Sequence, residues 1–344
     1  MGKNIFEKLI SKAAGGKEIK AGETLWLTPD IIALVDSGWR SKLKLFKQIG
    51  LERIQKPEKV VGVIDHCTEQ LAVPEGAENN KVFRDFAKAN GITKFHDVGK
   101  GGMMVQVLAE QYILPGQVGL VNDPEAEACN ALGAFCFFGD TSLGMITDQF
   151  IFEVPEFAKC TVTGKFQKGV MSTDLKRKLL GDLGSKYGKY IEFDGPTIDE
   201  MSIDERMNLC ILLYMCGSKG IIAADDKVVE YMKARRTESF EVVKSDPDAE
   251  YADYLKYDVT DLEPQISCPP TPNNVKGVSE LKGIKINAAS IGSCASGRMD
   301  DLRIAAEILK GKKVHEDVRL TIAPCSQEIM SQAANEDVYK RQVL

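Results

Sequence analysis

The sequence predicts an α/β protein with mainly parallel sheets, and two observations lead to this prediction. In the first block of the chain, residues 1–149, strand-like apolar runs such as residues 60–64 alternate with segments of helical periodicity such as residues 81–90. This alternation is typical of parallel strands joined by covering helices. The chain has 344 residues, of which 44% are hydrophobic, so it can form two or three domains that each bury a core.

A second α/β block is expected over residues 150–275. It begins with a strand-like run at residues 150–155 and has helix candidates at residues 207–214 and 227–236. It ends in an acidic, proline-bearing segment, residues 248–272. Because proline disfavours helix, we expect this segment to be an extended linker.

The third block, residues 276–336, places one cysteine in a turn between a strand and a helix. The alternating run 283–291 predicts the strand, and apolar residues at helical spacing after Asp301 predict the helix. Cys294 lies in the small-residue turn between them. Free N–H groups at a helix start stabilise a thiolate, the form that binds metal or attacks carbon. Cys294 is therefore a candidate metal ligand, and a buried structural cysteine is the alternative.

The composition indicates the cellular compartment of the protein and the kinds of molecule that it binds. Nine cysteines at irregular gaps indicate reduced thiols rather than a disulfide framework. The net charge of -6 argues against a general nucleic-acid surface. No apolar run is long enough to cross a bilayer, and the N-terminal residues lack the apolar core of a signal peptide. We expect a soluble, cytoplasmic protein that acts on a small molecule and binds neither nucleic acid nor membranes.

The last residues, 337–344, differ in character from the rest of the chain. Residues 337–342 read Asp-Val-Tyr-Lys-Arg-Gln, which can be back-translated to the transposon end used in preparing DNA sequencing libraries. We expect adapter sequence here, with the natural chain continuing past about Glu336 and the third block cut short after its second strand, residues 318–323. An ordinary polar tail is the alternative.

Motifs spread along most of the chain share an order and spacing with a known family. They are Asp65-His66, residues 106–110 leading to 114–116, residues 131–135, 154–156, 292–294 and 324–327, and the helical segment 302–314. Together they resemble the aconitase superfamily, and within it the large subunits of isopropylmalate isomerase and homoaconitase. The resemblance implies α/β/α three-layer domains with mainly parallel sheets, of which the third is incomplete.

The family resemblance also implies a chemistry. In this family three cysteine thiolates hold a [4Fe-4S] cluster whose open iron acts as a Lewis acid on a hydroxy carboxylic acid. The implied activity is that of a hydro-lyase, with a swivelling domain on a separate small subunit as the partner. Cys294 matches the first cluster ligand. The family's other two ligands form a C-x-x-C pair that this chain lacks, so two further cysteine ligands are expected beyond its end.

The resemblance assigns roles to seven further positions. Asp65 and His66 match an Asp-His pair that lines the pocket, and a histidine held by a carboxylate suits proton transfer. Glu125 replaces a pocket histidine and is expected to take over an acid/base role. The catalytic candidates are Asp65, His66, Asp123, Glu125 and Arg298; the cofactor-binding candidates are Ser293 and Ser296.

Several family positions carry different side chains here. Val105 stands in place of a pocket histidine, and Met215 stands in place of a carboxylate. These changes indicate a less highly charged substrate or a catalytically inactive paralogue with a binding or regulatory role. A hydro-lyase with a mononuclear metal held by Cys294 and nearby carboxylates is a further alternative.

Overall fold

The computed structural model describes residues 2–66, 74–336 and 338. Most of the expected adapter tail, residues 337 and 339–344, lies outside the described residues. Among those described, no helix has the length and apolar character that a membrane span requires.

The first sheet has five parallel strands in the order β4-β3-β2-β5-β6. The strands are β2 (Ile31–Val35), β3 (Val60–Val63), β4 (Lys94–His96), β5 (Val118–Val121) and β6 (Phe135–Phe138). The first strand of this sheet along the chain, β2, lies in its centre. The chain then adds β3 and β4 on one side of β2, and β5 and β6 on the other. The direction of winding therefore switches between β2 and β5. In open α/β sheets, ligands bind at the carboxyl ends of the strands at such a switch.

Helices cover both faces of this sheet, which is why β2 is apolar throughout. Alternate side chains point to opposite faces: Ile31, Ala33 and Val35 enter one core and Ile32 and Leu34 the other. The flanking helices are α1 (Ile5–Ala13), α2 (Trp39–Gln48), α3 (Pro74–Asn90), α4 (Met104–Gln111), α5 (Thr141–Thr147), and the 3₁₀ helices η1 (Pro57–Lys59) and η3 (Pro124–Leu132).

The second sheet is also parallel and shares a core with the first. Its order is β10-β9-β8-β11, with β8 (Phe157–Thr163), β9 (Tyr190–Asp194), β10 (Gly220–Ile221) and β11 (Asp253–Asp258). Its helices are α6 (Ser172–Leu183), η4 (Gly184–Lys186), α7 (Pro196–Glu200), α8 (Ile203–Cys210), η5 (Leu213–Cys216) and α9 (Asp226–Lys233). The predicted α/β class with mainly parallel sheets is confirmed.

Three expectations for the second block need correction. The segment 248–272 is not simply a linker, because β11 lies within it and pairs with β8 along its whole length. The strand at the start of the block, β7 (Phe150–Glu153), instead pairs antiparallel with β1 (Thr24–Leu27) of the first block. The helix expected at 207–214 ends at Cys210, because Leu212 takes a left-handed conformation with φ 68° before η5 begins.

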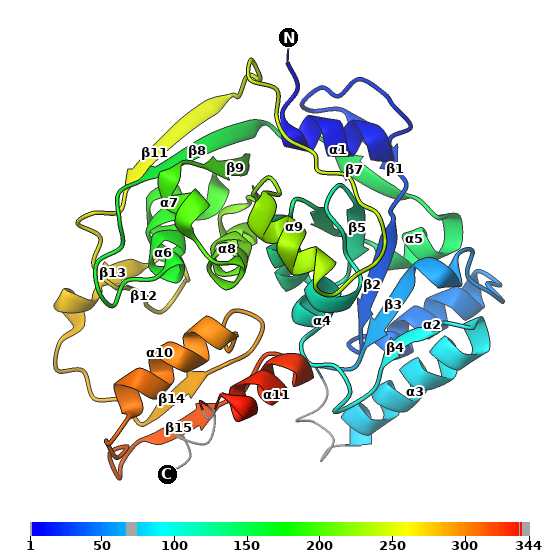
Figure 1. The fold of residues 1–344 in the computed structure, drawn as a ribbon. Helices are drawn as coiled ribbons and strands as arrows, with labels where there is room; N and C mark the ends of the chain where they lie inside the picture. Colours follow the sequence, from blue (N-terminus) through cyan, green and yellow to red (C-terminus); the bar gives the residue numbers. More distant parts are fainter. Residues whose placement is uncertain (1, 67–73, 337, 339–344) are drawn as a thin grey trace.

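In Figure 1 the third block lies below the second, with α10 beneath α6 and α8, and α11 beneath α4 of the first block. It contains the parallel pair β14 (Ala288–Ile291) and β15 (Arg319–Ile322), with α10 (Met299–Leu309) and α11 (Gln327–Asn335). The hairpin β12 (Gln265–Ser267) and β13 (Val275–Gly277), followed by η6 (Val278–Leu281), leads into it. Its core is small and centres on Met299, Leu302, Cys325, Ile329 and Ala333.

Candidate functional site

The winding switch of the first sheet gathers acidic side chains at the carboxyl ends of three neighbouring strands. Asp36 follows β2, Asp65 and His66 follow β3, and Asp123 follows β5. Asp36 is fully buried and its Oδ1 accepts the backbone N–H groups of Asp65 (3.0 Å) and His66 (2.8 Å). One buried carboxylate therefore fixes the backbone that presents the Asp-His pair.

Asp65 in turn fixes the orientation of the His66 ring. Its Oδ1 lies 2.7 Å from His66 Nδ1, and its Oδ2 accepts the backbone N–H of Met104, at the start of α4, at 2.7 Å. The opposite ring nitrogen, Nε2, faces Asp123 Oδ2 at 3.8 Å, which is too long for a direct hydrogen bond. The side chain of His66 is 39% exposed, so Nε2 remains accessible to a ligand.

The carboxylates around His66 favour its charged form. The hydrogen bond to Asp65 is the main reason that the pKa of His66 rises to about 9, although burial opposes this rise. Burial raises the pKa of Asp65, and its hydrogen bond to His66 opposes that rise. His66 is therefore an imidazolium at neutral pH and can donate a proton from Nε2.

Asp123 and Glu125 form a coupled carboxyl pair at the start of η3. Asp123 is the N-cap, because its Oδ1 accepts the Glu125 N–H at 3.1 Å and Pro124 occupies the first helical position. Burial, together with the neighbouring Glu125, raises the pKa of Asp123 to about 8. Burial alone would raise the pKa of Glu125, but hydrogen bonds from Asp123 and from Tyr214 Oη, 3.1 Å away, lower it. The pair thus holds a proton on Asp123 and a carboxylate on Glu125.

The Cys294 turn is built on two glycines and one hydroxyl. Gly292 and Gly297 have φ of 141° and 79°, and a Cβ on either would lie 2.5 Å from the carbonyl oxygen of Ala323. The Ser296 hydroxyl donates to the Gly292 carbonyl at 2.6 Å and accepts its N–H at 2.9 Å. The turn therefore needs small residues against the end of β15, which explains the sequence pattern.

The sequence predicts a thiolate at Cys294, and the structure contradicts this prediction. The helix begins only at Met299, with Arg298 as its N-cap, so Cys294 lies before the helix and is not its N-cap residue. Burial and then the negative charge of Glu125 raise the pKa of Cys294 to about 11. The Ser293 hydroxyl, 3.9 Å from the sulfur, opposes this rise. Cys294 is a thiol in the protein alone.

Arg298 lies in a buried polar network rather than beside His66. Its side chain is fully buried, and Nε donates to Gln106 Oε1 (2.9 Å) while Nη1 donates to Asn208 Oδ1 (2.6 Å). Nη2 donates to the Cys294 carbonyl at 3.1 Å. These contacts tie the third block to α4 and α8. The placement suits a positioning role for Arg298, with its guanidinium bonded to protein groups.

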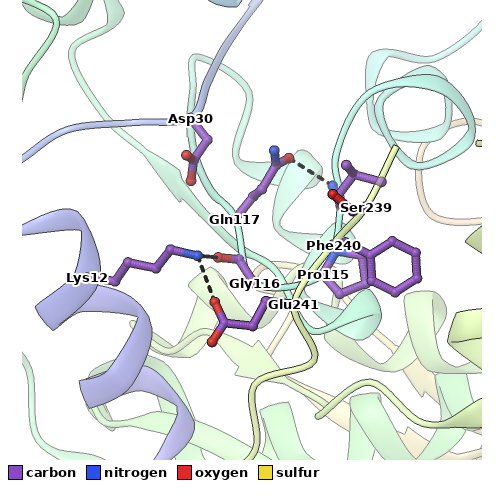
Figure 2. A pocket seen from close by; sticks show the side chains of 9 residues that line it. Lys12, Asp30, Pro115, Gly116, Gln117, Ser239, Phe240 and Glu241 are labelled. Atoms are coloured by element: carbon purple, nitrogen blue, oxygen red, sulfur yellow. Dashed lines mark hydrogen bonds and ion pairs between the residues drawn. The ribbon is translucent and has the colours of Figure 1, made fainter. Parts of the chain in front are cut away.

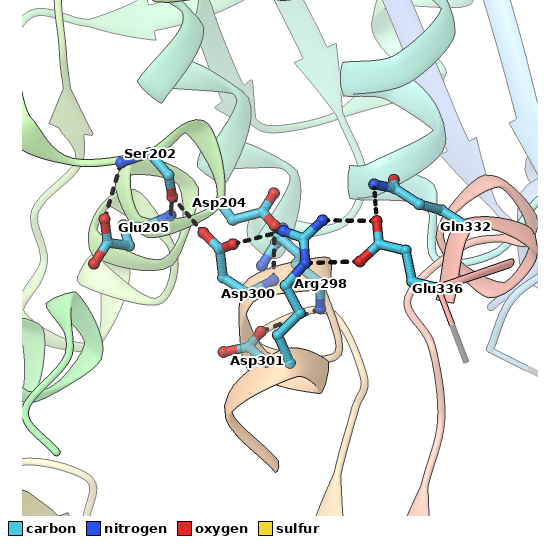
Figure 3. Close-up of polar contacts among 9 residues, drawn as sticks. Ser202, Asp204, Glu205, Arg298, Asp300, Asp301, Gln332 and Glu336 are labelled. Atoms are coloured by element: carbon cyan, nitrogen blue, oxygen red, sulfur yellow. Dashed lines mark hydrogen bonds and ion pairs between the residues drawn. The ribbon is translucent and has the colours of Figure 1, made fainter. Parts of the chain in front are cut away.

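The acidic first turns of α8 and α10 meet beside this network (Figure 3). Ser202 Oγ donates to Asp300 Oδ2 at 2.6 Å, and Asp204 Oδ2 accepts the Asp300 N–H at 3.3 Å. Burial, followed by the nearby charge of Asp300, raises the pKa of Asp204. These contacts hold the start of α10, and with it the Cys294 turn, against the second block.

Two pockets lie at opposite ends of the first sheet. A pocket of about 210 Å³ opens beside Asp65, between Gly102 and Met103 on one side and Cys325 and Ser326 on the other. A larger pocket of about 420 Å³, shown in Figure 2, lies at the amino end of β5 and is lined by Lys12, Asp30, Gln117 and Glu241, among others. The second pocket is the larger, but the first is lined by Asp65, whose carboxylate holds the His66 ring.

A [4Fe-4S] cluster needs three thiolates, and the described residues bring one to the site. Among residues 2–66, 74–336 and 338, the group of side chains close enough to share one metal ion is Asp36, Asp65 and His66. Asp36 Oδ1, both Asp65 oxygens and His66 Nδ1 take part in the hydrogen bonds described above. Cys325 is buried in the small core of the third block. The described residues therefore do not by themselves fit the cluster.

Two residues of this site, Asp36 and Tyr214, were not predicted from the sequence. Asp36 directly follows a strand at the switch, so its position at a strand end was a usable signal. Tyr214 lies in an apolar segment, residues 211–216, and nothing in the local sequence marks its contact with Glu125.

Known proteins resemble the chain over nearly its whole length. The model of the Aconitase family (aconitate hydratase) matches residues 7–282 and 274–341. The 3-isopropylmalate dehydratase large subunit 1 of Methanopyrus kandleri is 37% identical over 98% of this chain and 82% of its own length. The 3-isopropylmalate dehydratase large subunit of Heliobacterium modesticaldum is 38% identical over 98% of this chain and 81% of its own length.

A solved structure shares the fold. The crystal structure of Thermococcus kodakaraensis aconitase X (holo-form) superposes with a TM-score of 0.52 and 13% identity, covering 91% of this chain and 75% of that one. The resemblance inferred from the motifs is confirmed.

Proposed function

Because the chain belongs to the aconitase family, we propose that it is the large-subunit chain of a hydro-lyase that removes water from, or adds water to, a hydroxy carboxylic acid. The observation that carries this proposal is the group of Asp65, His66, Asp123 and Glu125 at the winding switch. It combines an accessible imidazolium with a carboxyl pair that shares a proton. Elimination of water needs an acid for the leaving hydroxyl and a base for the carbon-bound proton.

His66 is the proposed acid. Asp65 holds the ring and stabilises its charge, and Nε2 is free to donate to a hydroxyl placed in the space between His66 and Asp123. Asp123, protonated at neutral pH, then returns a proton to Nε2 and becomes a carboxylate beside the ionised Glu125, and a proton from solvent restores the pair. In the hydration direction the same groups act in reverse, with neutral His66 taking a proton from the attacking water.

The proposed cofactor is a [4Fe-4S] cluster, and the proposed partner is a small subunit. The cluster would supply Lewis-acid polarisation of the hydroxyl, with Cys294 as one ligand. The described residues contribute one thiolate of the three that such a cluster requires. The small subunit would bring the base that takes the carbon-bound proton. The proposed location is the cytoplasm, where thiols stay reduced.

A binding or regulatory role without dehydration is the second candidate. The observation in its favour is that burial, and then the negative charge of Glu125, raise the pKa of the Cys294 thiol. A negative charge at this place opposes the thiolate form that a metal ligand must take.

Anaerobic assays separate the two candidates. The chain is mixed with its small subunit and reconstituted with iron and sulfide, and the conversion of 2-alkylmalates and of the matching unsaturated acids is followed. The hydro-lyase proposal predicts interconversion and a brown, iron-loaded protein. A colourless protein that binds the acids without converting them would favour the second candidate.

A further inference from the structure

A chain of buried hydrogen bonds runs from the start of α11 to the Cys294 turn. Glu110, on α4, is 4% exposed, and its Oε1 accepts the Ser326 hydroxyl at 2.7 Å and the Gln106 amide nitrogen at 2.9 Å. The oxygen of that amide accepts Arg298 Nε at 2.9 Å, and Arg298 Nη2 donates to the Cys294 carbonyl at 3.1 Å. One oxygen of Glu110 therefore joins two separate parts of the third block.

Glu110 decides which way the Gln106 amide faces. An amide presents donors on one side and an acceptor on the other, whereas the Arg298 guanidinium has donors only. Because Glu110 accepts the amide N–H of Gln106, the amide oxygen is left to face Arg298. An amide turned the other way would set its NH₂ group against the guanidinium and leave buried donors without an acceptor. The acceptor on Glu110 thus fixes the hydrogen bond between Gln106 and Arg298.

The Ser326 end of this chain of bonds forms one wall of a pocket. Ser326 makes an antiparallel bridge with Gly102, where no Cβ fits because it would lie 2.5 Å from the Cys325 carbonyl oxygen. The pocket of about 210 Å³ beside Asp65 has the Gly102 loop as one wall and the Ser326 segment as the other. The bridge and the hydrogen bond to Glu110 together fix the separation of these walls.

Apolar packing alone does not set the position of the third block. Its buried core is a small cluster of its own, apart from the two larger clusters that surround β2. Contact between apolar surfaces is non-directional, whereas hydrogen bonds are directional. The angle at which the third block meets the first therefore depends on buried polar contacts such as those of Glu110.

We propose that Glu110 is a positioning residue of the reaction site, which places both the Cys294 turn and the pocket wall at Ser326 relative to Asp65. The catalytic consequence of this inference rests on the proposed hydro-lyase function, which gives Glu110 no part. Glu110 acts through Gln106 and Ser326 and does not itself transfer a proton.

Labelling of cysteines measures the exposure of the Cys294 turn without any need for activity. The full chain is treated with a maleimide, and the labelling rate of each cysteine is read by mass spectrometry of its peptide. Cys294 and Cys268 are both half-buried, and Cys160 is fully buried in β8. Cys268 gives the rate of a thiol outside the network, and Cys160 reports global unfolding.

Three variants separate positioning from stability. Glu110→Met removes the acceptor, and Glu110→Gln keeps one. Glu192→Met is the matched control, because Glu192 is a buried glutamate of the second block whose Oε2 also accepts two hydroxyls, from Ser245 (2.6 Å) and Tyr251 (2.7 Å). Glu110→Met should raise the labelling of Cys294 about 10-fold relative to the half-buried control cysteine, since loss of a buried acceptor shifts a local opening equilibrium by about this factor. Glu110→Gln should restore the wild-type ratio, and Glu192→Met should leave it unchanged.

Turnover of the chain assembled with its small subunit gives the catalytic readout. A displacement of about 1 Å at a reaction site costs about 10²-fold in rate, so kcat should fall by this factor in Glu110→Met and recover in Glu110→Gln. If Glu110→Met does not fold, Gln106→Leu breaks the same chain of bonds and should give the same rise in Cys294 labelling.

Three results would overturn the inference. They are wild-type labelling of Cys294 in Glu110→Met, an equal rise for Cys294, Cys268 and Cys160, and a Glu110→Gln variant that behaves like Glu110→Met. Absence of turnover in the wild type would count against the proposed function instead, because the labelling ratios do not depend on activity.

Discussion

His66 Nε2 lies 3.8 Å from Asp123 Oδ2, although the two residues follow strands that are separated by β2. The two residues come together because β3 and β5 flank β2, where the winding direction of the sheet changes. Asp36, at the end of β2, binds the backbone of His66 from between them. The topology of the sheet, rather than proximity in sequence, thus creates the proton-transfer group.

The hydroxyl of Tyr214 should keep Glu125 ionised. Tyr214→Phe removes a hydrogen bond to a half-buried carboxylate, so the pKa of Glu125 should rise and the protein should lose about 1 kcal/mol at pH 7. Because the pKa of Glu125 is lowered in the folded state, this stabilisation is present above the unfolded pKa and is lost as pH falls through the folded value. Urea unfolding at pH 7 and pH 4 measures the difference. An equal loss at both pH values would contradict the account.

Glu110 should make stability fall as pH rises towards neutrality. Burial raises its pKa to about 7, although its Oε1 accepts hydrogen bonds from Ser326 Oγ (2.7 Å) and Gln106 Nε2 (2.9 Å). A raised carboxyl pKa stabilises the fold below the unfolded pKa, and the effect disappears as pH rises through about 7. Glu110→Gln keeps an acceptor oxygen and should remove a pH-dependent contribution of up to about 3 kcal/mol between pH 4 and 8. Parallel pH profiles of unfolding free energy for the two proteins would refute this.

The buried ion pair of Lys219 and Glu127 should be costly to break from one side. Glu127 lies in η3 and Lys219 precedes β10, so the pair joins the first two blocks. Lys219→Met leaves an unpaired buried carboxylate and should destabilise the protein by about 3–5 kcal/mol. The exposed control Lys178→Met should cost at most about 0.5 kcal/mol. Chemical denaturation compares them, and a cost for Lys219→Met no larger than the control's would be inconsistent with a buried pair.

Arg298 should act by fixing the third block. Arg298→Lys cannot reproduce the fork that reaches Gln106, Asn208 and the Cys294 carbonyl. We expect faster limited proteolysis within residues 278–298, with the first two blocks remaining intact. Arg303→Lys is the control, because Arg303 is 44% exposed and pairs with Glu336 at the surface. Wild-type protection of residues 278–298 in Arg298→Lys would argue against a positioning role.

The sequence predicted the buried strands well and an edge strand poorly. Strand β3 is buried along its whole length, so its continuous apolar run was visible in the sequence. Strand β11 alternates between half-buried and exposed residues at the edge of its sheet. Because it lies at an edge, β11 carries Asp, Lys and Tyr side chains. Together with the nearby prolines, these polar residues made the segment look like a linker in the sequence.

Site residues could be predicted only where a local sequence motif marks them. Asp65, His66 and Asp123 stand in motifs at strand ends, and the structure places them together. Tyr214 gave no such signal, since its role depends on a contact with Glu125, 89 residues away in the chain.

The proton-transfer role of His66 is tested by the hydration rate of an unsaturated acid by the His66→Gln variant, assembled with the small subunit and compared with His315→Gln. Glutamine can still bond to Asp65 but cannot donate a transferable proton. His315 is an exposed histidine, with 70% of its side chain accessible. His66→Gln is expected to lower turnover by about 10²- to 10⁴-fold, with substrate affinity retained and His315→Gln unchanged. Wild-type turnover in His66→Gln would contradict the assignment of this group as the proton-transfer site.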